Sequence, residues 1–288
     1  MLEQNYSLEQ LLEMLTNITN IHVCIHDISG ICNGIKLSIS YPYTIHSKNF
    51  CNIAKSTQKG YETCIQCKIF ANCKAVDTKE LFHGYCPYGL YEIVQPVVID
   101  EKVQCIIYIG NIVLNEEITI HKLKNTSMLT KVETEQLITQ LNTTQRVNAL
   151  DYYIFLAQFI NDNIRRLSEE DRGTDNSKNT LYHWAVLAVK NIIHDDFRQK
   201  LSLESIAKLY FMNEKYIGRL FKEQMGHTFR EYMNMIRLKY AANQLIETRE
   251  KIIVIALESG YQNVTYFNKI FLEAYGVTPA KYRKLYGN

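Results

Sequence analysis

The sequence predicts an α+β N-terminal domain, a helical connector and an all-α C-terminal domain built from two helix-turn-helix units. Two observations lead to this organisation. The first part of the chain alternates helix-like and strand-like segments and contains all eight cysteines. The last third contains a helical pattern that returns after 50 residues. We expect the three parts to span residues 1–128, 129–179 and 180–288.

The N-terminal domain is expected to begin with a helix. Ser7 and Gln10 form a capping-box pattern before leucines at helical spacing, which predicts a helix over residues 7–19. Two pairs of β-like runs follow, over residues 21–40 and 90–114. The expected hairpin turns are Ser29-Gly30 and Asp100-Glu101-Lys102. With a Cys-rich helical insert between the hairpins, this order is typical of sensory modules of the PAS or GAF type.

The connector has helical periodicity from Thr130 to about Leu167. An approximate heptad seam in it contains Val147, Leu150, Ile154, Ala157 and Ile164. Asn161 also lies in this seam, and a polar residue at such a position often sets the register of paired helices. The pattern predicts either a dimerisation helix or a helix that packs on its own sensory domain. The polar stretch over residues 168–180 is the expected interdomain linker.

Composition and charge narrow the class of protein. A chain of 288 residues that is 47% apolar is long enough for two domains, and it is neither charged enough nor repetitive enough to be disordered. No stretch approaches the roughly 18 apolar residues of a membrane helix, so we expect a cytoplasmic protein with no membrane contact. From Thr180 onward, 16 Lys and Arg stand against 10 Asp and Glu, a net of +6, whereas the remainder has a net of −4. This local positive excess favours a polyanionic partner such as nucleic acid.

The C-terminal part uses one supersecondary unit twice. GHTFREY, from Gly226 to Tyr232, matches GVTPAKY, from Gly276 to Tyr282, in the pattern Gly-x-Thr-x-x-x-Tyr. Further pairs match upstream at an offset of 49 or 50 residues: Tyr216 with Tyr266, Arg219 with Lys269, Phe221 with Phe271, and Ile206-Ala207 with Ile255-Ala256. Such self-similarity indicates a duplicated structural element.

Each unit is predicted to be a helix, a tight turn and a second helix. In the first unit, Ser202 caps the first helix and Asn213 caps the second, which ends at Gly226. In the second unit, Gly260 suits the turn and Asn263 caps the second helix. Apolar residues of each second helix fall on one stripe, so the opposite face remains exposed.

The exposed faces of the two second helices are the predicted DNA contacts. Their residues are Lys215, Gly218, Arg219 and Lys222 in the first unit, and Thr265, Asn268 and Lys269 in the second. Arg219 can bond a guanine edge at two points and Asn268 an adenine edge, whereas Lys222 is expected to contact phosphates. Thr228 is expected to cap a spacer helix of roughly 19 residues, about 28 Å long. One turn of B-DNA is about 34 Å, so this spacer can place both second helices in successive major grooves.

The segments LSLESIAKLYFMNEKYIGRLFKEQMGHTFREYMNMIRLKYAANQLI and IALESGYQNVTYFNKIFLEAYGVTPAKYRK resemble the DNA-binding domain of the AraC/XylS family, over residues 181–286. The resemblance implies recognition of a bipartite promoter site on double-stranded DNA, usually with activation through contact with RNA polymerase. The sequence departs from the family pattern at Gly218, which has no side chain to read a base, and at Leu272, where Lys is usual.

The segments FCNIAKSTQKGYETCIQC, YCPYGLYEIVQPVVID and CIIYIGNIVL resemble the sensory domain of the PocR family, over residues 50–114. The resemblance implies a small organic effector such as a short diol or alcohol. Cys51, Cys64 and Cys86 stand where this family tends to have Cys, whereas Pro87 replaces a frequent His. Neighbouring aromatic residues complete the expected ligand-binding set of Cys51, Cys64, Tyr85, Cys86, Tyr88 and Tyr91.

The cysteines also allow a metal site. Cys64-x-x-Cys67 and Cys73, together with Cys51 and Cys86, supply enough thiolates for a zinc ion or an iron–sulfur cluster. Buried or free thiols are the alternative interpretation of the same residues. His83, close to Cys86 in the sequence, is expected to pack against its neighbours and not to bind a metal.

These features together predict a ligand-responsive, sequence-specific DNA-binding transcription regulator that acts as a homodimeric activator. Alternatives are a regulator that senses metal or redox state through its cysteines, and a DNA-repair regulator that accepts an alkyl group on a cysteine. The chain contains no Pro-Cys-His acceptor motif, no phosphate-binding glycine loop, no His-Glu-x-x-His and no nucleophile elbow. We therefore expect no enzymatic activity.

Overall fold

The computed structural model describes residues 6–19, 21–44, 46, 48–172 and 183–287, which form two compact units. The first unit comprises the sensory part up to residue 184 with residues 208–211, and the second comprises residues 185–207 and 212–288. The predicted linker at 168–180 lies outside the described residues from position 173 onward. Within the described ranges, no helix has both the length and the apolar character needed to cross a membrane.

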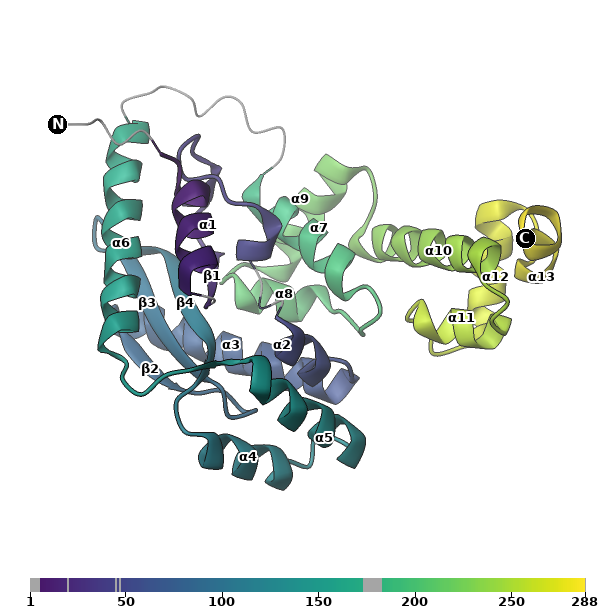
Figure 1. Cartoon of the computed structure of the whole chain (residues 1–288). Helices are drawn as coiled ribbons and strands as arrows, with labels where there is room; N and C mark the ends of the chain where they lie inside the picture. The colour runs from purple at the N-terminus through teal and green to yellow at the C-terminus, as the bar shows by residue number, and fades with distance from the viewer. Residues whose placement is uncertain (1–5, 20, 45, 47, 173–182, 288) are drawn as a thin grey trace. The chain divides into compact units, whose positions relative to one another are not determined.

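A five-stranded sheet forms the centre of the first unit (Figure 1). Its strands are β1 (His22–Asp27), β2 (Phe82–Tyr85), β3 (Tyr91–Ile99), β4 (Lys102–Val113) and β5 (Gln145–Arg146). The order is β1-β4-β3-β2 with antiparallel neighbours, and β5 pairs with β4 in parallel. The predicted hairpin over residues 90–114 is confirmed as β3 and β4. Its turn residues Asp100 and Glu101 have φ of 49° and 62°, the backbone that a two-residue hairpin turn requires.

The predicted hairpin over residues 21–40 is wrong, because only its first half is a strand. The carboxylate of Asp27 accepts hydrogen bonds from four successive backbone N–H groups, those of Ser29, Gly30, Ile31 and Cys32. These bonds turn the chain into the short 3-10 helix η1 (Ile31–Asn33). Strand β1 therefore pairs with β4 and has no partner among residues 31–40.

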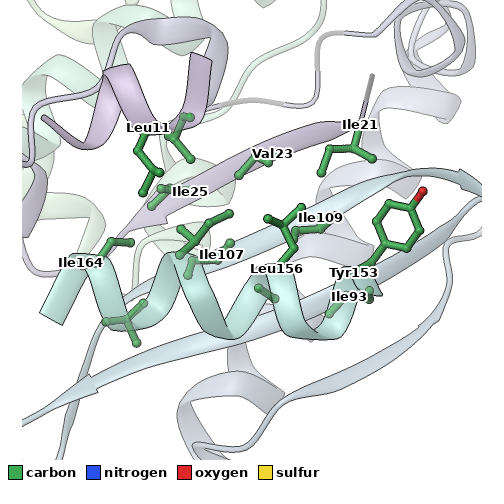
Figure 2. Close-up of a cluster of buried hydrophobic side chains, with 14 of the residues drawn as sticks. Leu11, Ile21, Val23, Ile25, Ile93, Ile107, Ile109, Tyr153, Leu156 and Ile164 are labelled. Carbon is green, nitrogen blue, oxygen red and sulfur yellow. The ribbon is translucent and has the colours of Figure 1, made fainter. Parts of the chain in front are cut away.

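Two helices cover one face of this sheet: α1 (Leu8–Thr19) and α6 (Asp151–Arg172). Figure 2 shows the core they enclose, with Leu11 of α1 and Leu156 and Ile164 of α6 directed at apolar residues of β1, β3 and β4. The predicted capping box of α1 is confirmed, because Gln10 N donates to Ser7 Oγ and Ser7 N donates to Gln10 Oε1.

The heptad seam of the connector belongs to this same core. Its residues Val147, Ala157 and Ile164 are buried in it, and Leu150 and Ile154 pack against it. Asn161 lies half-buried on α6 and donates to the carboxylate of Asp162. Of the two interpretations given to the seam, packing on the chain's own sensory domain is therefore the one observed.

The remaining helices of the first unit lie at the opposite face and at the edge of the sheet, apart from the 3-10 helix η2 (Tyr41–Tyr43), whose Tyr43 packs against the core under α1 and α6. The others are the 3-10 helix η3 (Leu141–Thr143) and the α-helices α2 (Asn49–Ala54), α3 (Gln58–Thr78), α4 (Glu116–Asn125) and α5 (Lys131–Gln140). The Cys-rich segment forms α3, which Thr57 caps by accepting from the Gly60 N–H. Helix α3 packs on β3 and β4 through a cluster that includes Ala75, Val94, Ile106 and Tyr108.

The second unit is entirely helical in its described residues. Its helices are α7 (Trp184–Asp196), α8 (Leu203–Leu209), α9 (Glu214–Met225), α10 (Phe229–Glu247), α11 (Ile252–Glu258), α12 (Val264–Tyr275) and α13 (Pro279–Tyr286). Helices α8 and α9 form the first predicted unit, α11 and α12 form the second, and the long helix α10 joins them (Figure 1).

The duplication extends to the helix caps. Asn213 and Asn263 each accept a hydrogen bond from the backbone N–H three residues later, at 3.1 and 2.9 Å. Gly226 and Gly276 end α9 and α12 in the left-handed conformation, with φ of 72° and 71°. The predicted Ser202 and Thr228 caps are also present, so the expected boundaries of these helices are confirmed.

Candidate functional sites

A pocket lies between α2, α3 and strands β3 and β4 in the first unit. Its cavity volume is about 30 Å³, which limits any ligand held inside it to a very small molecule. Its walls are formed by His46, Phe50, Cys51, Ala54, Lys55, Cys64, Cys67, Lys68, Cys86, Pro87, Tyr88, Leu90, Glu92 and Asn111. Most of these side chains are apolar or sulfur-bearing, and a few charged ones converge among them.

A buried charge cluster forms the polar part of this pocket. Lys68 Nζ of α3 donates to Glu92 Oε2 at 2.7 Å, and His46 Nδ1 donates to Glu92 Oε1 at 3.1 Å. The Lys68 ammonium also lies 4.0 Å from the centre of the Tyr108 ring, a cation–π contact. The Lys68 and Glu92 side chains are only 7% and 12% exposed. Lysine is rarely buried this deeply unless it is paired, and a buried charged pair with perturbed pKa values that lines a pocket marks a candidate functional site.

Local geometry fixes the charge states of the cluster. Burial alone would raise the pKa of Glu92, but the Lys68 ammonium and His46 hold it well below its usual range. Burial would lower the pKa of Lys68, and the Glu92 carboxylate instead raises it. Burial, together with the nearby Lys68 charge, lowers the pKa of His46 to about 3. At neutral pH the pocket therefore holds an ammonium–carboxylate pair and an uncharged imidazole.

A β-bulge brings an amide into the same pocket. The pairing of β3 with β4 shifts register between Tyr91 and Ile93, where β4 has an extra residue. Asn111 lies there with φ of 61°, and its Oδ1 is buried without a hydrogen-bond partner among the described residues. A Cβ at neighbouring Gly110 would lie 3.1 Å from Glu92 Oε1, so this glycine leaves room for the carboxylate. The bulge thus provides an unused hydrogen-bond acceptor.

The structure brings four of the six predicted ligand-binding residues to this pocket. Cys51, Cys64, Cys86 and Tyr88 line it, and the Tyr88 hydroxyl donates to the Gly60 carbonyl at 3.0 Å. The other two predicted residues lie elsewhere. Tyr85 lines a shallow outer groove beside the pocket, and Tyr91 belongs to the core under α6.

Tyr91 is directed away from the pocket because alternate residues of β3 point to opposite faces of the sheet. Its hydroxyl lies 2.7 Å from His83 Nδ1, so His83 has a packing partner. This contact agrees with the role expected for His83.

The predicted cysteine ligands are only partly gathered. Cys51, Cys64, Cys67 and Cys86 line the pocket, whereas Cys73 of the same helix does not. Burial raises the pKa of Cys51 to about 12 and that of Cys67 to about 11, and it also raises the pKa of Cys86. Without a metal these thiols are protonated at neutral pH, the unreactive form of cysteine.

Sequence reasoning missed the charged residues of the pocket, although two signals for them exist. Glu92 is a charged residue inside the apolar strand segment YEIVQPVVI, and Lys68 lies in the Cys-rich helix. A charged residue within a strand that is otherwise apolar indicates either a solvent-facing position or a buried polar site. His46 and Asn111 carry no comparable signal, because a loop and a bulge bring them to the pocket.

The predicted DNA-contact residues of the second unit lie on exposed faces of α9 and α12. Lys215, Arg219 and Lys222 are exposed on α9, and Thr265, Asn268 and Lys269 are exposed on α12. Beneath them, the apolar stripes are buried, with Phe221 and Phe271 fully covered. Each face carries an ion pair between residues four positions apart: Arg219 with Glu223 at 3.7 Å on α9, and Lys269 with Glu273 at 3.9 Å on α12.

Gly218, one of the predicted DNA-contact residues, also has a role in helix packing that was not predicted. It is half-buried, and a Cβ there would lie 3.1 Å from Leu203 Cδ2 of α8. The missing side chain therefore permits close contact between the two helices of the first unit. Leu272, the other departure from the expected pattern, is 45% exposed on α12.

Comparisons with known proteins match both units. Residues 4–168 match the family model of a sensory domain found in PocR, and residues 206–285 match that of a helix-turn-helix domain. The first match covers more than half of the chain. The second begins within α8, ends within α13 and includes the helix between the duplicated units.

Similar proteins match part of this chain. The uncharacterized transcriptional regulatory protein YesN of Bacillus subtilis is 33% identical over 129 residues, which are 43% of this chain and 35% of YesN. The bifunctional transcriptional activator/DNA repair enzyme AdaA of Bacillus subtilis is 34% identical over 97 residues, 34% of this chain and 46% of AdaA. This chain thus spans less than half the length of these relatives.

A solved structure also matches part of this chain. The C-terminal domain of AraT, a response regulator from Geobacillus stearothermophilus, is 31% identical. The match covers 38% of this chain and 91% of that domain, with a TM-score of 0.37.

Proposed function

We propose that this chain, which belongs to the family that carries the PocR sensory domain and has an AraC-type helix-turn-helix domain, is a transcription regulator controlled by a small organic effector. The observation that carries the proposal is the pairing of two equivalent exposed helices, α9 and α12, with a buried, charged pocket on the same chain. In this role the protein works beside DNA in the cytoplasm, and no catalytic step is assigned to it.

The pocket favours an uncharged effector with two hydroxyl groups, such as a short diol. Lys68 and Glu92 pair with each other, and the Lys55 ammonium in the same wall donates to the His46 carbonyl at 3.0 Å, so an uncharged ligand leaves these contacts intact. The Asn111 Oδ1 atom has no donor within the described ranges, and the Glu92 oxygens can each accept a further hydrogen bond. Apolar walls from Phe50, Ala54 and Leu90 suit a short hydrocarbon chain.

On the DNA side, we propose that α9 and α12 enter successive major grooves. Helix α10 has 19 residues, about 28 Å of helix, which is close to the about 34 Å of one turn of B-DNA. Arg219 is the candidate for bidentate contact with guanine and Asn268 for contact with adenine. Lys215, Thr265 and Lys269 contact bases or phosphates in this arrangement, and Lys222 contacts a phosphate.

We further propose that the protein acts as a homodimer that activates transcription through RNA polymerase. The residues of the connector seam are used in the sensory core, so a dimer must use the other face of α6. That face exposes Tyr152, Phe155 and Phe159, which are 52%, 63% and 37% exposed. A two-fold axis would let this row of aromatic residues pack on its own copy.

Footprinting on genomic fragments with the full-length protein tests the DNA proposal. We expect two protected segments in adjacent major grooves on one face of the DNA. Arg219→Ala should cost about 1–3 kcal/mol at one base pair and leave other positions unchanged. Lys102→Ala removes an exposed cation of the β3–β4 hairpin and is the charge-matched control. Equal loss of affinity for every DNA sequence with Arg219→Ala would contradict base reading by this residue.

A further inference from the structure

Strand β1 places three potential metal ligands on one face of the sheet. His22, Cys24 and His26 alternate along the strand, so their side chains share the face that packs against α3. His46, from the segment before α2, lies over them, with its ring centre 5.5 Å from that of His22 and 6.3 Å from that of His26. One ligand atom each from Cys24, His26 and His46 lies within 4.8 Å of the others.

The hydrogen bonds of the two imidazoles leave a nitrogen lone pair on each. His46 Nδ1 lies 3.1 Å from the ionised Glu92 carboxylate and must donate to it. His26 Nδ1 lies 3.2 Å from Asn72 Oδ1, which also accepts from the Tyr108 hydroxyl at 2.5 Å, so this atom is an acceptor and His26 donates. With the proton on Nδ1 in both rings, both Nε2 atoms carry lone pairs that a metal ion can use.

The Nε2 atom of His46 is a specific sign of a missing partner. The side chain is 8% exposed, and Nε2 is buried with no hydrogen-bond partner in the part of the chain that the structure describes. Buried polar atoms in folded proteins are almost always satisfied, so an unpaired one requires an explanation. A metal ion bound at this atom supplies one, and the Glu92 carboxylate behind the ring is the kind of group that orients metal-binding histidines.

We propose that Cys24, His26 and His46 form a binding site for Zn²⁺. Two imidazole nitrogens and one thiolate are ligands that zinc prefers, and its fourth position is filled by a water molecule or by His22. The ligand atoms of a tetrahedral zinc lie about 3.4 Å apart, so binding draws these side chains together by at most about 1.5 Å. The Cys24 thiol loses its proton as the Zn–S bond forms, and one proton is released to solvent for each ion bound.

This site differs from the one expected from the cysteine pattern. It uses Cys24 of β1 and none of the cysteines that line the pocket. It shares His46 with the pocket, because the two nitrogens of this ring face Glu92 on one side and the site on the other. The proposal does not depend on the identity of the effector, and its test needs no DNA.

Cobalt is the probe for this site, because thiolate-bound Co²⁺ absorbs in the near-ultraviolet and tetrahedral Co²⁺ absorbs in the visible. The full chain is stripped with a chelator, kept under anaerobic conditions and titrated with Co²⁺. We expect one equivalent of Co²⁺ per chain to produce both absorption bands, and we expect added Zn²⁺ to displace the bound Co²⁺. Cys24→Ser should abolish the thiolate band, whereas Cys64→Ser, which alters the pocket, should leave it unchanged.

Histidine variants keep the test meaningful if Cys24→Ser does not fold. In His46→Asn, the amide nitrogen replaces Nδ1 toward Glu92, but no atom replaces Nε2, so Co²⁺ affinity should fall at least tenfold in a folded protein. Circular dichroism checks the fold of each variant. Absence of stoichiometric binding by the unmodified chain, or a band lost in Cys64→Ser and retained in Cys24→Ser, would overturn the proposal.

Discussion

Lys68 of α3 and Glu92 of β3 form an ion pair of 2.7 Å inside the first unit, with Tyr108 against the ammonium. This pair connects the Cys-rich helix to the sheet, and it also supplies the polar groups of the candidate pocket. A buried pair of this kind gains little over apolar packing, but loss of one partner leaves an uncompensated charge. Substitution of either Lys68 or Glu92 should therefore affect both the stability of the first unit and ligand binding.

Lys68→Met should destabilise the sensory unit by about 3–5 kcal/mol, because the Glu92 carboxylate is then buried without its counter-ion. Thermal unfolding of the full chain measures this. The exposed pair of Arg146 with Glu116 is a matched control, since Arg146→Met breaks an ion pair that water already screens. The variant Lys68→Met with Glu92→Gln should recover part of the stability. Similar losses in Lys68→Met and Arg146→Met would contradict this account.

The effector pocket gives a separate prediction. A short diol should raise the melting temperature of the unmodified chain, because binding to the folded state stabilises it. Asn111→Leu replaces the unused acceptor with an apolar group of similar size and should reduce this shift. Val132→Ser, at an exposed position on α5, should leave it unchanged. A full shift in Asn111→Leu would show that the amide takes no part in binding.

Acid should destabilise the sensory unit through two histidines. Burial lowers the pKa of His26 to about 4, and burial with the Lys68 charge lowers that of His46 to about 3, against about 6.5 for free histidine. Their contribution is present above pH 6.5 and is lost as the pH falls toward 4 and then 3, because the unfolded chain binds protons that the folded chain does not. Each pKa unit corresponds to about 1.4 kcal/mol.

Urea unfolding of the metal-free protein at a series of pH values measures this effect. The unmodified chain should lose stability steadily below pH 6.5, and His46→Asn should show a shallower dependence. Identical pH dependence in both proteins would exclude His46 as a source of the effect.

The sequence predicted the C-terminal unit well because its signals are local. Caps at Asn213 and Asn263 and left-handed glycines at Gly226 and Gly276 depend on residues three or four apart. One irregularity was hidden. The turn after α8 uses Phe211 with φ of 54°, at the place where the second unit has Gly260.

The sensory unit was harder to predict because its contacts are distant in sequence. Strand β1 pairs with β4, about 80 residues later in the sequence. The expected hairpin is prevented by four hydrogen bonds to the Asp27 carboxylate, and the spacing of apolar residues does not reveal such bonds. Four of the six residues expected from the resemblance to the PocR sensory domain and from their aromatic neighbours line the pocket, yet its charged groups were missed. His46 and Glu92 meet only when the sheet and the loop before α2 are in place.

The exposed aromatic residues on the outer face of α6 lead to a prediction about the oligomeric state. Phe155 and Phe159 stack with ring centres 6.4 Å apart on the exposed face of the helix. Phe155→Glu should convert the dimer to a monomer, because a charge would be buried in the proposed interface. Light scattering after size-exclusion chromatography measures the mass, and Val132→Glu on exposed α5 is the control. A monomeric unmodified chain, or a dimeric Phe155→Glu, would contradict the proposal.

Substitution by alanine at two glycines of the second unit should lower its stability by different amounts. Gly260 and Gly276 both have positive φ, 85° and 71°, so alanine strains the backbone at either position by about 1–2 kcal/mol. At Gly276 a Cβ meets nothing within 4 Å, whereas at Gly260 it would lie 2.8 Å from the Phe197 carbonyl oxygen. That same carbonyl accepts from Arg237 Nε of α10 at 2.6 Å, so it cannot move away freely. Gly260→Ala should therefore be the more destabilising change. Its extra loss of stability relative to Gly276→Ala should be about 1–3 kcal/mol, the usual cost of overpacking. Calorimetry of the full chain measures both variants, and equal melting temperatures would show that the segment around Phe197 yields to the added methyl group.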